Sequence, residues 1–317
     1  MTIFEGQIGP GKSIKSLTLG QQSVADGVGI DPGGTITVQH FGKRKLRTCL
    51  WNAERLQGSS GGRGKSAHGD NPLPLLIFNG IGLNLEVLGP LAADLADRPV
   101  LSIDMPGIGH SPPSKVPYTP QMAAKWGAQL LERHNIERAD VLGSSWGGAV
   151  AQHFASSHRD QLGRLVLAAI GPSLPILPGK ATFSVNIMDS IWQGDLARSD
   201  LLRQVNEADQ RAVIDEVQSL FIPPTKRGYS LQALSLLAWN SVFSIPFLDC
   251  ETLILAGRQD QIVPLANQQL LHLLLRRAQL DVIEDAGHLF MFSHRNEVAQ
   301  RLRDFLGSGK VKSEKMR

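Results

Sequence analysis

Six short apolar runs, separated by segments with helical periodicity, constrain the fold of this chain more than any other feature. Apolar runs of roughly four to eight residues between turn signals are typical of buried strands. The six runs are residues 73–79, 99–104, 139–144, 162–169, 251–257 and 278–284. Because strands that alternate with helices form βαβ units, we predict an α/β fold with a mostly parallel, doubly wound sheet covered on both faces.

Two of the intervening segments carry the signals of helix ends. Thr119 is a suitable N-cap, and Pro120 follows it at the first helical position. The second helical pattern follows Pro264 and ends in Arg276 and Arg277, whose charges suit a helix C-terminus. We therefore predict one helix that begins after Thr119 and another that runs from Pro264 to Arg277.

The same patterns divide the chain into a core, an inserted cap and several extensions. The core comprises residues 35–170 and 250–307, and it begins with two alternating, antiparallel strand patterns at 35–41 and 47–51. Residues 171–249 separate two neighbouring strands by more chain than a crossover needs. We predict that they form a helical cap over the C-terminal edge of the sheet, where open α/β sheets bind ligands. The remaining segments are a loose N-terminal arm at 1–34, a Gly-rich insertion at about 57–72 and a basic tail at 308–317.

Two stretches come close to the phosphate-binding template G-x-x-x-x-G-K-[ST], but neither has the context that such a loop requires. Residues 6–13 fit the template, yet only five residues precede them, too few for a central strand, and no helical pattern follows. Residues 58–66 have one residue too many between their first and last glycines, and they follow no apolar run. We therefore exclude nucleotide binding at both stretches.

Composition and charge exclude several further classes of protein. The formal net charge is +3, and the basic clusters at 43–47 and 310–317 are interpreted as solvated surface, because no basic stripe with interleaved aromatic residues is present. No apolar run approaches the ~18 residues that span a bilayer, and no secretory signal opens the sequence. The two cysteines, Cys49 and Cys250, fit a reducing compartment, and no His/Cys cluster has metal-ligand spacing. We expect a cytoplasmic protein without a metal, organic cofactor, nucleic-acid partner or transmembrane segment, and its oligomeric state is left open.

The chemistry is expected at residues 143–147, which read G-x-S-x-G with Ser145 at the centre. The motif comes directly after the third apolar run and before a helical pattern that begins near Trp146. A nucleophile at so sharp a strand-to-helix turn has a strained backbone. Side chains two residues away on either side would collide, so the turn requires Gly143 and Gly147. The N-terminal N–H groups of the helix point to where negative charge develops. Ser145 is therefore the candidate nucleophile.

A serine nucleophile needs a base and an acid, which follow it in chain order in this architecture. His288 lies in a loop just after the last apolar run, where the histidine of such a triad is expected. Asp260 lies in the loop after the run 251–257 and is the candidate acid. The alternative position, one strand earlier, has no carboxylate. Asp281 and Asp285 lie on or beside the last strand, where they are poorly placed to orient the histidine.

An oxyanion hole needs two backbone N–H groups. One belongs to Trp146, the residue after the nucleophile, and the other to the loop after the first apolar run, where Ile81 follows Asn79 and Gly80. The glycines of this loop allow the backbone to approach a substrate closely. A second Gly-rich loop reaches the same edge, and its Asp104 is interpreted as a support for local backbone rather than as a triad member.

These motifs, in this order, resemble the α/β-hydrolase superfamily over roughly residues 72–306. The matching stretches are "DMPGIGHS", "GSSWGG", "LAGRQDQIVP" and "AGHLF". A narrower resemblance is to intracellular medium-chain-length poly(3-hydroxyalkanoate) depolymerases, whose oxyanion loop carries Asn-Gly, as does "FNGIGLNLE" here. The stretches "SSWGGAVAQHFA", "LVLAA" and "GHLF" agree as well, whereas the cap is only loosely similar.

The resemblance implies an α/β-hydrolase fold with an inserted cap. It also implies hydrolysis of the ester bonds of a storage polyester to 3-hydroxy acids, on granules in the cytoplasm. Carried over residue by residue, it makes Ser145 the nucleophile, His288 the base and Asp260 the acid.

Three other functions remain open on the sequence. A hydrolase of small soluble substrates, such as an ester, a lactone or a C–C bond flanked by ketones, would use the same residues. An acyltransferase or polyester synthase would favour cysteine at the position of Ser145, and a binding protein would merely retain the fold. Apolar stretches at 173–188 and 231–248 are expected either to pack the cap against the core or to form a docking face for a water-insoluble polyester.

Overall fold

The computed structural model describes residues 16–17, 33–56, 72–173, 215–237 and 239–307. Within these ranges one sheet has the strand order β1-β2-β3-β5-β4-β6-β7-β8-β9. Its strands are β1 (Ser16–Leu17), β2 (Thr35–Phe41), β3 (Arg44–Trp51), β4 (Leu75–Phe78), β5 (Val100–Ile103), β6 (Ala139–Ser144), β7 (Leu162–Ala168), β8 (Thr252–Gly257) and β9 (Ala278–Ile283). Strands β4 to β9 pair in parallel, and β1 to β3 add antiparallel strands at one edge, with β3 beside β5.

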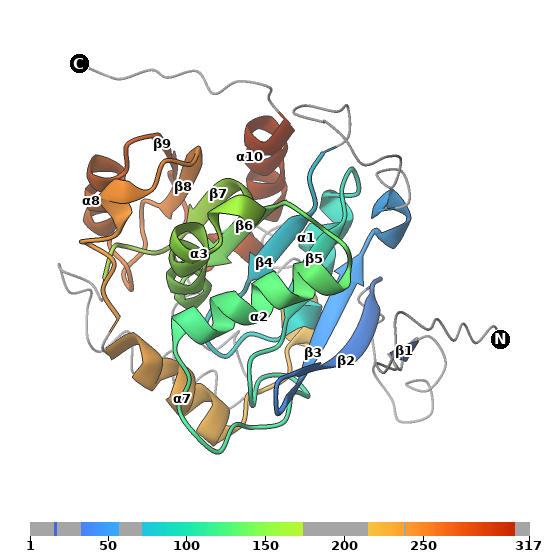
Figure 1. The fold of residues 1–317 in the computed structure, drawn as a ribbon. Helices are drawn as coiled ribbons and strands as arrows, with labels where there is room; N and C mark the ends of the chain where they lie inside the picture. Colours follow the sequence, from blue (N-terminus) through green and yellow to red (C-terminus); the bar gives the residue numbers. More distant parts are fainter. Residues whose placement is uncertain (1–15, 18–32, 57–71, 174–214, 238, 308–317) are drawn as a thin grey trace.

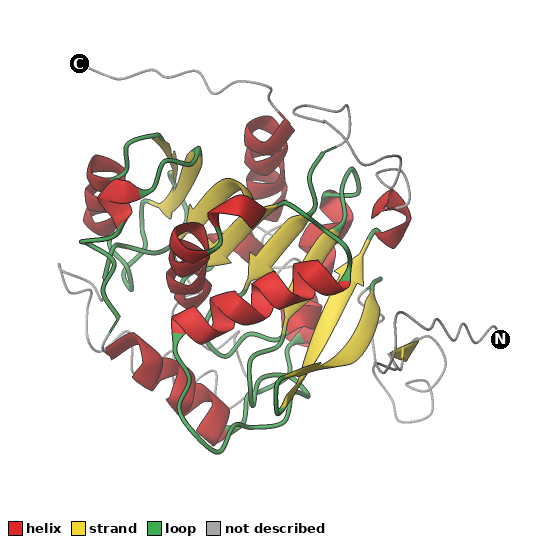
Figure 2. Cartoon of the chain, viewed as in Figure 1, coloured by secondary structure: helices red, strands yellow, loops and turns green. Residues whose placement is uncertain are grey.

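Helices follow the parallel strands, and α2 and α3 cross in front of the sheet in Figure 1, with the same view coloured by structure type in Figure 2. The α-helices are α1 (Gly89–Asp94), α2 (Pro120–Arg133), α3 (Trp146–Ser157), α7 (Lys226–Leu237), α8 (Leu265–Leu274), α9 (Phe290–Ser293) and α10 (Arg295–Gly307). Short 3₁₀ segments are η1 (Ala53–Leu56), η2 (Leu85–Leu88), η3 (Arg159–Gln161) and η5 (Ile245–Phe247). Each of the six predicted apolar runs coincides with one strand from β4 to β9, so the α/β fold predicted from their alternation is confirmed.

The alternation of side chains along β4 shows why the sheet is buried on both faces. Leu75 and Ile77 pack in one apolar cluster with residues of α1 and α10, whereas Leu76 and Phe78 pack in the other with residues of α2, α3 and α8. All four side chains are fully buried. Because successive residues of a strand point to opposite faces, a strand with apolar residues at every position requires a covering layer on each side.

One predicted helix end is confirmed and one is wrong. The side chain of Thr119 accepts a hydrogen bond from the N–H group of Met122 at 3.4 Å, as an N-cap does. The second helix, α8, ends at Leu274 and does not include the two arginines that were predicted to close it. The carbonyl oxygen of Arg277 instead accepts a hydrogen bond from the N–H of Thr252 at 2.9 Å. Pairing with β8 therefore draws this segment into the sheet before the helix can continue.

Part of the predicted cap, residues 171–249, belongs to the described chain. Residues 215–220 are helical, and α7 follows at the lower edge of the molecule in Figure 1. Residues 174–214 lie outside the described residues, as do the Gly-rich stretch 57–71, the basic tail and both stretches that resemble phosphate loops. Within the predicted arm, Ser16–Leu17 pairs with β2. Among the helices of the described ranges, none has the length and apolar character needed to span a bilayer.

Candidate active site

Ser145 occupies the turn between β6, which ends at Ser144, and α3, which begins at Trp146. Its backbone has φ 50° and ψ −117°, a conformation that residues with a side chain rarely adopt. Two backbone hydrogen bonds of 2.8 Å hold the turn: Ser145 N–H donates to the carbonyl of Ala168, and Gly148 N–H donates to the carbonyl of Ser145. This turn places the hydroxyl at the C-terminal edge of the parallel strands.

Close backbone approach explains the glycines on either side of Ser145. A Cβ atom on Gly143 would overlap the carbonyl oxygen of Gly147. A Cβ atom on Gly147 would overlap the carbonyl oxygen of Phe78, the last residue of β4, and would lie 2.7 Å from that of Asn79. The start of α3 therefore touches the end of β4, which brings the loop after β4 next to the serine.

His288 and Asp260 meet Ser145 at this edge. His288 lies in the turn between β9 and α9, and its Nε2 atom is 3.0 Å from Oγ of Ser145. On the other side of the ring, Nδ1 lies 2.8 Å from Oδ2 of Asp260, in the loop between β8 and α8. Only 7% of His288 and 4% of Asp260 are exposed, so little water competes for these hydrogen bonds. The structure thus joins the three predicted side chains in one hydrogen-bonded chain.

The second carboxylate oxygen of Asp260 fixes the orientation of this carboxylate toward His288. Oδ1 accepts the N–H groups of Ile262 and Val263, each at 2.9 Å, so both oxygens are engaged. A fixed carboxylate that accepts Nδ1–H leaves Nε2 of the imidazole unprotonated and facing the serine hydroxyl. Such a ring can take the serine proton and carry the resulting positive charge beside the carboxylate. Asp281, the alternative acid on the last strand, pairs with Arg301 instead.

The loop after β4 holds a backbone N–H group that has no acceptor among the residues that the structure describes. The groups on either side are engaged: Gly80 N–H donates to Oδ1 of Asn79 at 2.9 Å, and Gly82 N–H donates to a side-chain oxygen from α7 at 2.8 Å. The N–H of Ile81, between them, has no protein acceptor there. A Cβ atom on Gly80 would lie 3.7 Å from Cβ of Ser145, so this loop borders the nucleophile.

Trp146 supplies a second N–H group without an acceptor in the described part of the chain. It is the first residue of α3, and the first N–H groups of a helix have no intrahelical partner. Its indole N–H donates to α7 at two points, the carbonyl of Gln232 at 3.1 Å and Oγ of Ser235 at 2.9 Å. The indole also packs edge-on against Tyr118 with ring centroids 6.2 Å apart, and burial raises the pKa of this tyrosine. Both residues predicted as oxyanion donors therefore present unpaired N–H groups close to the serine.

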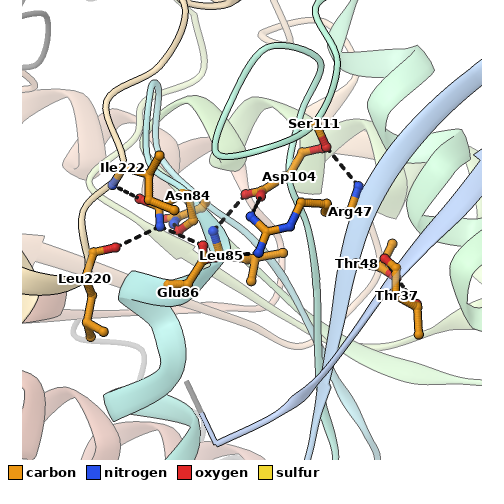
Figure 3. Close-up of polar contacts among 11 residues, drawn as sticks. Thr37, Arg47, Thr48, Asn84, Leu85, Glu86, Asp104, Ser111, Leu220 and Ile222 are labelled. Carbon is orange, nitrogen blue, oxygen red and sulfur yellow. Dashed lines mark hydrogen bonds and ion pairs between the residues drawn. The ribbon is translucent and has the colours of Figure 1, made fainter. Parts of the chain in front are cut away.

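A buried polar network supports this loop from β3, as Figure 3 shows. The guanidinium of Arg47 pairs with Glu86 and, at 3.0 Å, with Asp104. Oδ1 of Asp104 accepts the N–H of Leu85 at 2.8 Å, so this carboxylate holds local backbone and lies outside the serine–histidine–aspartate chain. Burial, and then the neighbouring Glu86 carboxylate, raise the pKa of Asp104 well above its ordinary range.

Asn84 links the same network to residues 220–222, which lie within the predicted cap (Figure 3). Its side-chain nitrogen donates to the carbonyl of Leu220 at 2.9 Å and to Oε2 of Glu86 at 2.7 Å. Its side-chain oxygen accepts the N–H of Ile222 at 3.0 Å, and its own carbonyl accepts from the side chain of Asn79 at 3.0 Å. The segment at 220–222 is therefore bonded directly to the loop that borders the nucleophile.

The sequence did not predict the contacts of Gln232 or those of Asn84, although Asn84 lies within the predicted oxyanion loop. Their partners are 150 and 138 positions away in the chain, and a single amide side chain gives no local signal of so distant a partner. No group of three or more His, Cys, Asp or Glu side chains within the described ranges is arranged to hold a metal ion.

The fold and the site together define a class of protein. A mostly parallel sheet carries a serine at the β6–α3 turn, an aspartate after β8 and a histidine after β9. The chain belongs to the alpha/beta hydrolase family, whose family model matches residues 75–301. The resemblance predicted from the motifs is confirmed.

Individual relatives within this family differ in what they act on. The chain is 33% identical over 249 residues to a poly(3-hydroxyalkanoate) depolymerase of Ectopseudomonas oleovorans, which covers 74% of this chain and 84% of that protein. It is 28% identical to a 2-hydroxymuconate semialdehyde hydrolase of Pseudomonas sp. strain CF600, with 74% and 86% covered. The solved structure of an enol-lactonase from Burkholderia xenovorans LB400 has a TM-score of 0.68 at 21% identity, covering 86% and 100%, a likeness of fold alone.

Proposed function

We propose that this chain is a serine hydrolase that cleaves carboxylic ester bonds, and that its substrate is a poly(3-hydroxyalkanoate), which it depolymerises to 3-hydroxy acids. One observation carries the proposal: the hydrogen-bonded side chains of Ser145, His288 and Asp260 lie next to the N–H groups of Ile81 and Trp146, which have no acceptor in the described part of the chain. The similarity to a poly(3-hydroxyalkanoate) depolymerase supports the choice of polyester.

The first half of the reaction forms an acyl-enzyme. Nε2 of His288 accepts the proton of Ser145 as Oγ attacks the ester carbonyl, and Asp260 stabilises the imidazolium. The oxyanion is bound by the backbone N–H groups of Ile81 and Trp146, which have no acceptor among the residues that the structure describes. Collapse of the tetrahedral intermediate breaks the C–O ester bond, and the departing alcohol takes the proton from Nε2. The acyl group remains on the serine.

The second half releases the acid and restores the enzyme. His288 removes a proton from a water molecule as the water attacks the acyl carbonyl, and the same N–H groups bind the second oxyanion. Collapse breaks the bond to Ser145 and returns the proton to its Oγ. Each cycle therefore consumes one ester bond and one water and releases one alcohol and one carboxylic acid.

Product analysis tests the choice of substrate. The protein is incubated with emulsified polyesters of short and of medium side-chain length, and the soluble products are identified by mass spectrometry. The proposal predicts 3-hydroxy acids or their short oligomers, and no release by Ser145→Ala. Hydrolysis of small aryl esters without any release from polymer would favour the small-substrate alternative. Cleavage of 2-hydroxymuconate semialdehyde in a parallel assay would favour C–C bond hydrolysis. The similarity to a 2-hydroxymuconate semialdehyde hydrolase supports that alternative.

Activity on a water-insoluble polymer also requires contact with its surface, which we propose occurs on granules in the cytoplasm. In the segment between α7 and β8, Phe243 is 85% exposed and Phe247 is 70% exposed, while Ile245 between them is fully buried and anchors the segment. Two exposed aromatic rings on a fixed segment suit attachment to an apolar surface.

Sedimentation with polyester granules tests this attachment. Replacing Phe243 and Phe247 together by serine is expected to lower the bound fraction and to leave hydrolysis of a soluble ester unchanged. Val38→Ser, which removes an exposed apolar side chain from β2, is the matched control. Equal sedimentation of the double variant and the control would contradict attachment through these rings.

A further inference from the structure

Gln232 of α7 contacts both sides of the proposed oxyanion site. Its side-chain oxygen accepts the N–H of Gly82 at 2.8 Å, and its backbone carbonyl accepts the indole N–H of Trp146 at 3.1 Å. Only 1% of the residue is exposed. One residue of the cap region is therefore bonded to the loop after β4 and to the residue after the nucleophile, although these two are far apart in the chain.

The bond to Gly82 fixes the peptide next to the one that carries the free donor. Gly82 has φ 74°, and the N–H of Leu83 donates to the carbonyl of Gly80 at 3.3 Å, so residues 80–83 form a turn with positive φ at its third position. The central peptide of such a turn, between Ile81 and Gly82, makes no hydrogen bond within the turn. The N–H of this peptide donates to the side chain of Gln232, and this contact fixes the orientation of the turn. The direction of the Ile81 N–H depends on that orientation.

Removing this acceptor would leave a buried donor without a partner. Such a group is strongly destabilising, and the loop would move to recover the lost bond. An oxyanion donor works only within a narrow range of distance, about 2.7–3.1 Å from the charged oxygen. A displacement of about 1 Å is enough to reduce the rate about 100-fold. A small shift of this turn would therefore lower the rate of ester hydrolysis and leave the fold unchanged.

We propose that Gln232 is a positioning residue for the oxyanion hole, acting with its side chain through Gly82 on the N–H of Ile81. The proposal rests on the proposed esterase function, because that function requires the oxyanion donors whose position Gln232 would fix. It makes α7 part of the framework that holds the proposed oxyanion donors in place. Gln232 itself does not touch the reacting atoms.

The experiment compares Gln232→Met with the wild type on a soluble aryl ester. Methionine matches the length of glutamine but lacks the amide oxygen that accepts the Gly82 N–H. We expect kcat, counted per active site by burst titration, to fall about 10- to 100-fold with KM changed less than threefold. The affinity for an alkyl trifluoromethyl ketone, whose adduct with the serine carries an oxyanion, should fall by the same factor as kcat/KM. Gln232→Asn, whose shorter side chain cannot reach Gly82, provides the same test should the methionine variant fold poorly.

Two control variants separate positioning from stability. Gln152→Met removes a buried amide of 3% exposure that bonds to Gly171 and Ser241 but not to the oxyanion loop, so it should lower the melting temperature without the loss of kcat. Ser230→Ala changes an exposed position on the same helix. Unchanged kcat and ketone affinity in both Gln232 variants, with Ser145→Ala inactive, would overturn the role of Gln232 and leave the proposed function standing. Full turnover by Ser145→Ala would overturn both.

Discussion

Gly147→Ala tests whether backbone contact between α3 and β4 builds the site. A Cβ atom at this position would overlap the carbonyl oxygen of Phe78 and would lie 2.7 Å from that of Asn79, whereas non-bonded heavy atoms settle at about 3.5–4.0 Å. Both obstacles are backbone atoms of β4 and its following loop, so no side chain can rotate away. Relief of the contact with Phe78 requires the start of α3 to move by about 1.6 Å relative to the sheet.

The expected loss follows from what that movement displaces. The start of α3 carries Ser145 and the N–H of Trp146, and a misplacement of about 1 Å at a reacting group costs about 100-fold in rate. Loss of one oxyanion donor costs about 100- to 1,000-fold. Overpacking of the contact should also reduce the free energy of unfolding by about 1–3 kcal/mol. We therefore expect kcat/KM to fall at least 100-fold while the protein remains folded.

The assay is initial-rate hydrolysis of an aryl ester, with urea unfolding measured on the same preparations. Gly34→Ala is the matched control, because the atoms nearest its Cβ would be outer side-chain atoms, Sγ of Cys49 at 2.5 Å and the indole of Trp51 at 2.7 Å, and such atoms can shift where backbone cannot. Because side chains can relieve such contacts by changing their torsion angles, the control should keep kcat/KM within about tenfold of the wild type. Near wild-type turnover in Gly147→Ala would refute the claim that this contact sets the position of the nucleophile.

Three further variants test other parts of the account. Asp260→Asn keeps an oxygen for the N–H groups of Ile262 and Val263 but presents an NH₂ group to His288. We therefore expect kcat to fall about 10,000-fold with the melting temperature nearly unchanged. A loss of kcat below tenfold would contradict the role of Asp260 as the acid. Asn84→Ala should reduce the free energy of unfolding by about 2–3 kcal/mol in urea, because it leaves buried backbone groups of the 220–222 segment unpaired. Burial and then a neighbouring carboxylate raise the pKa of Asp104 in the folded protein, so its contribution to stability is complete below the ordinary aspartate pKa of about 4 and falls as the pH rises from there through the raised pKa. Urea unfolding at a series of pH values should show a smaller fall for Asp104→Asn, and identical slopes would count against this.

Most of the sheet could be predicted because its strands are apolar at successive positions. Leu75 to Phe78 illustrate this, since both faces of β4 are buried and the pattern is unbroken. The end of α8 could not be predicted from helix signals, because Arg277 is held by a hydrogen bond to Thr252 in the neighbouring strand. Charge at a helix end is a local preference of a few tenths of a kcal/mol to about 1 kcal/mol, and strand pairing overrides it.

The positions of the three candidate catalytic side chains could be predicted for a different reason. Ser145, Asp260 and His288 each follow a strand of the parallel sheet, and the ends of such strands meet at one edge. Their order along the chain and the glycines of the turn narrowed the choice further. The contacts of Gln232 and Asn84 depend instead on how the cap region packs, for which no periodic pattern in the sequence carries information.

Reaction with a fluorophosphonate probe, followed by mass spectrometry of the digested protein, tests most directly whether the Ser145 hydroxyl is the activated nucleophile. We expect one phosphonyl group per chain, attached to Ser145, with esterase turnover lost in proportion to labelling and no labelling of His288→Ala on the same timescale. Turnover that disappears while Ser145 stays unmodified, or labelling that is equally fast without the histidine, would contradict this role of Ser145.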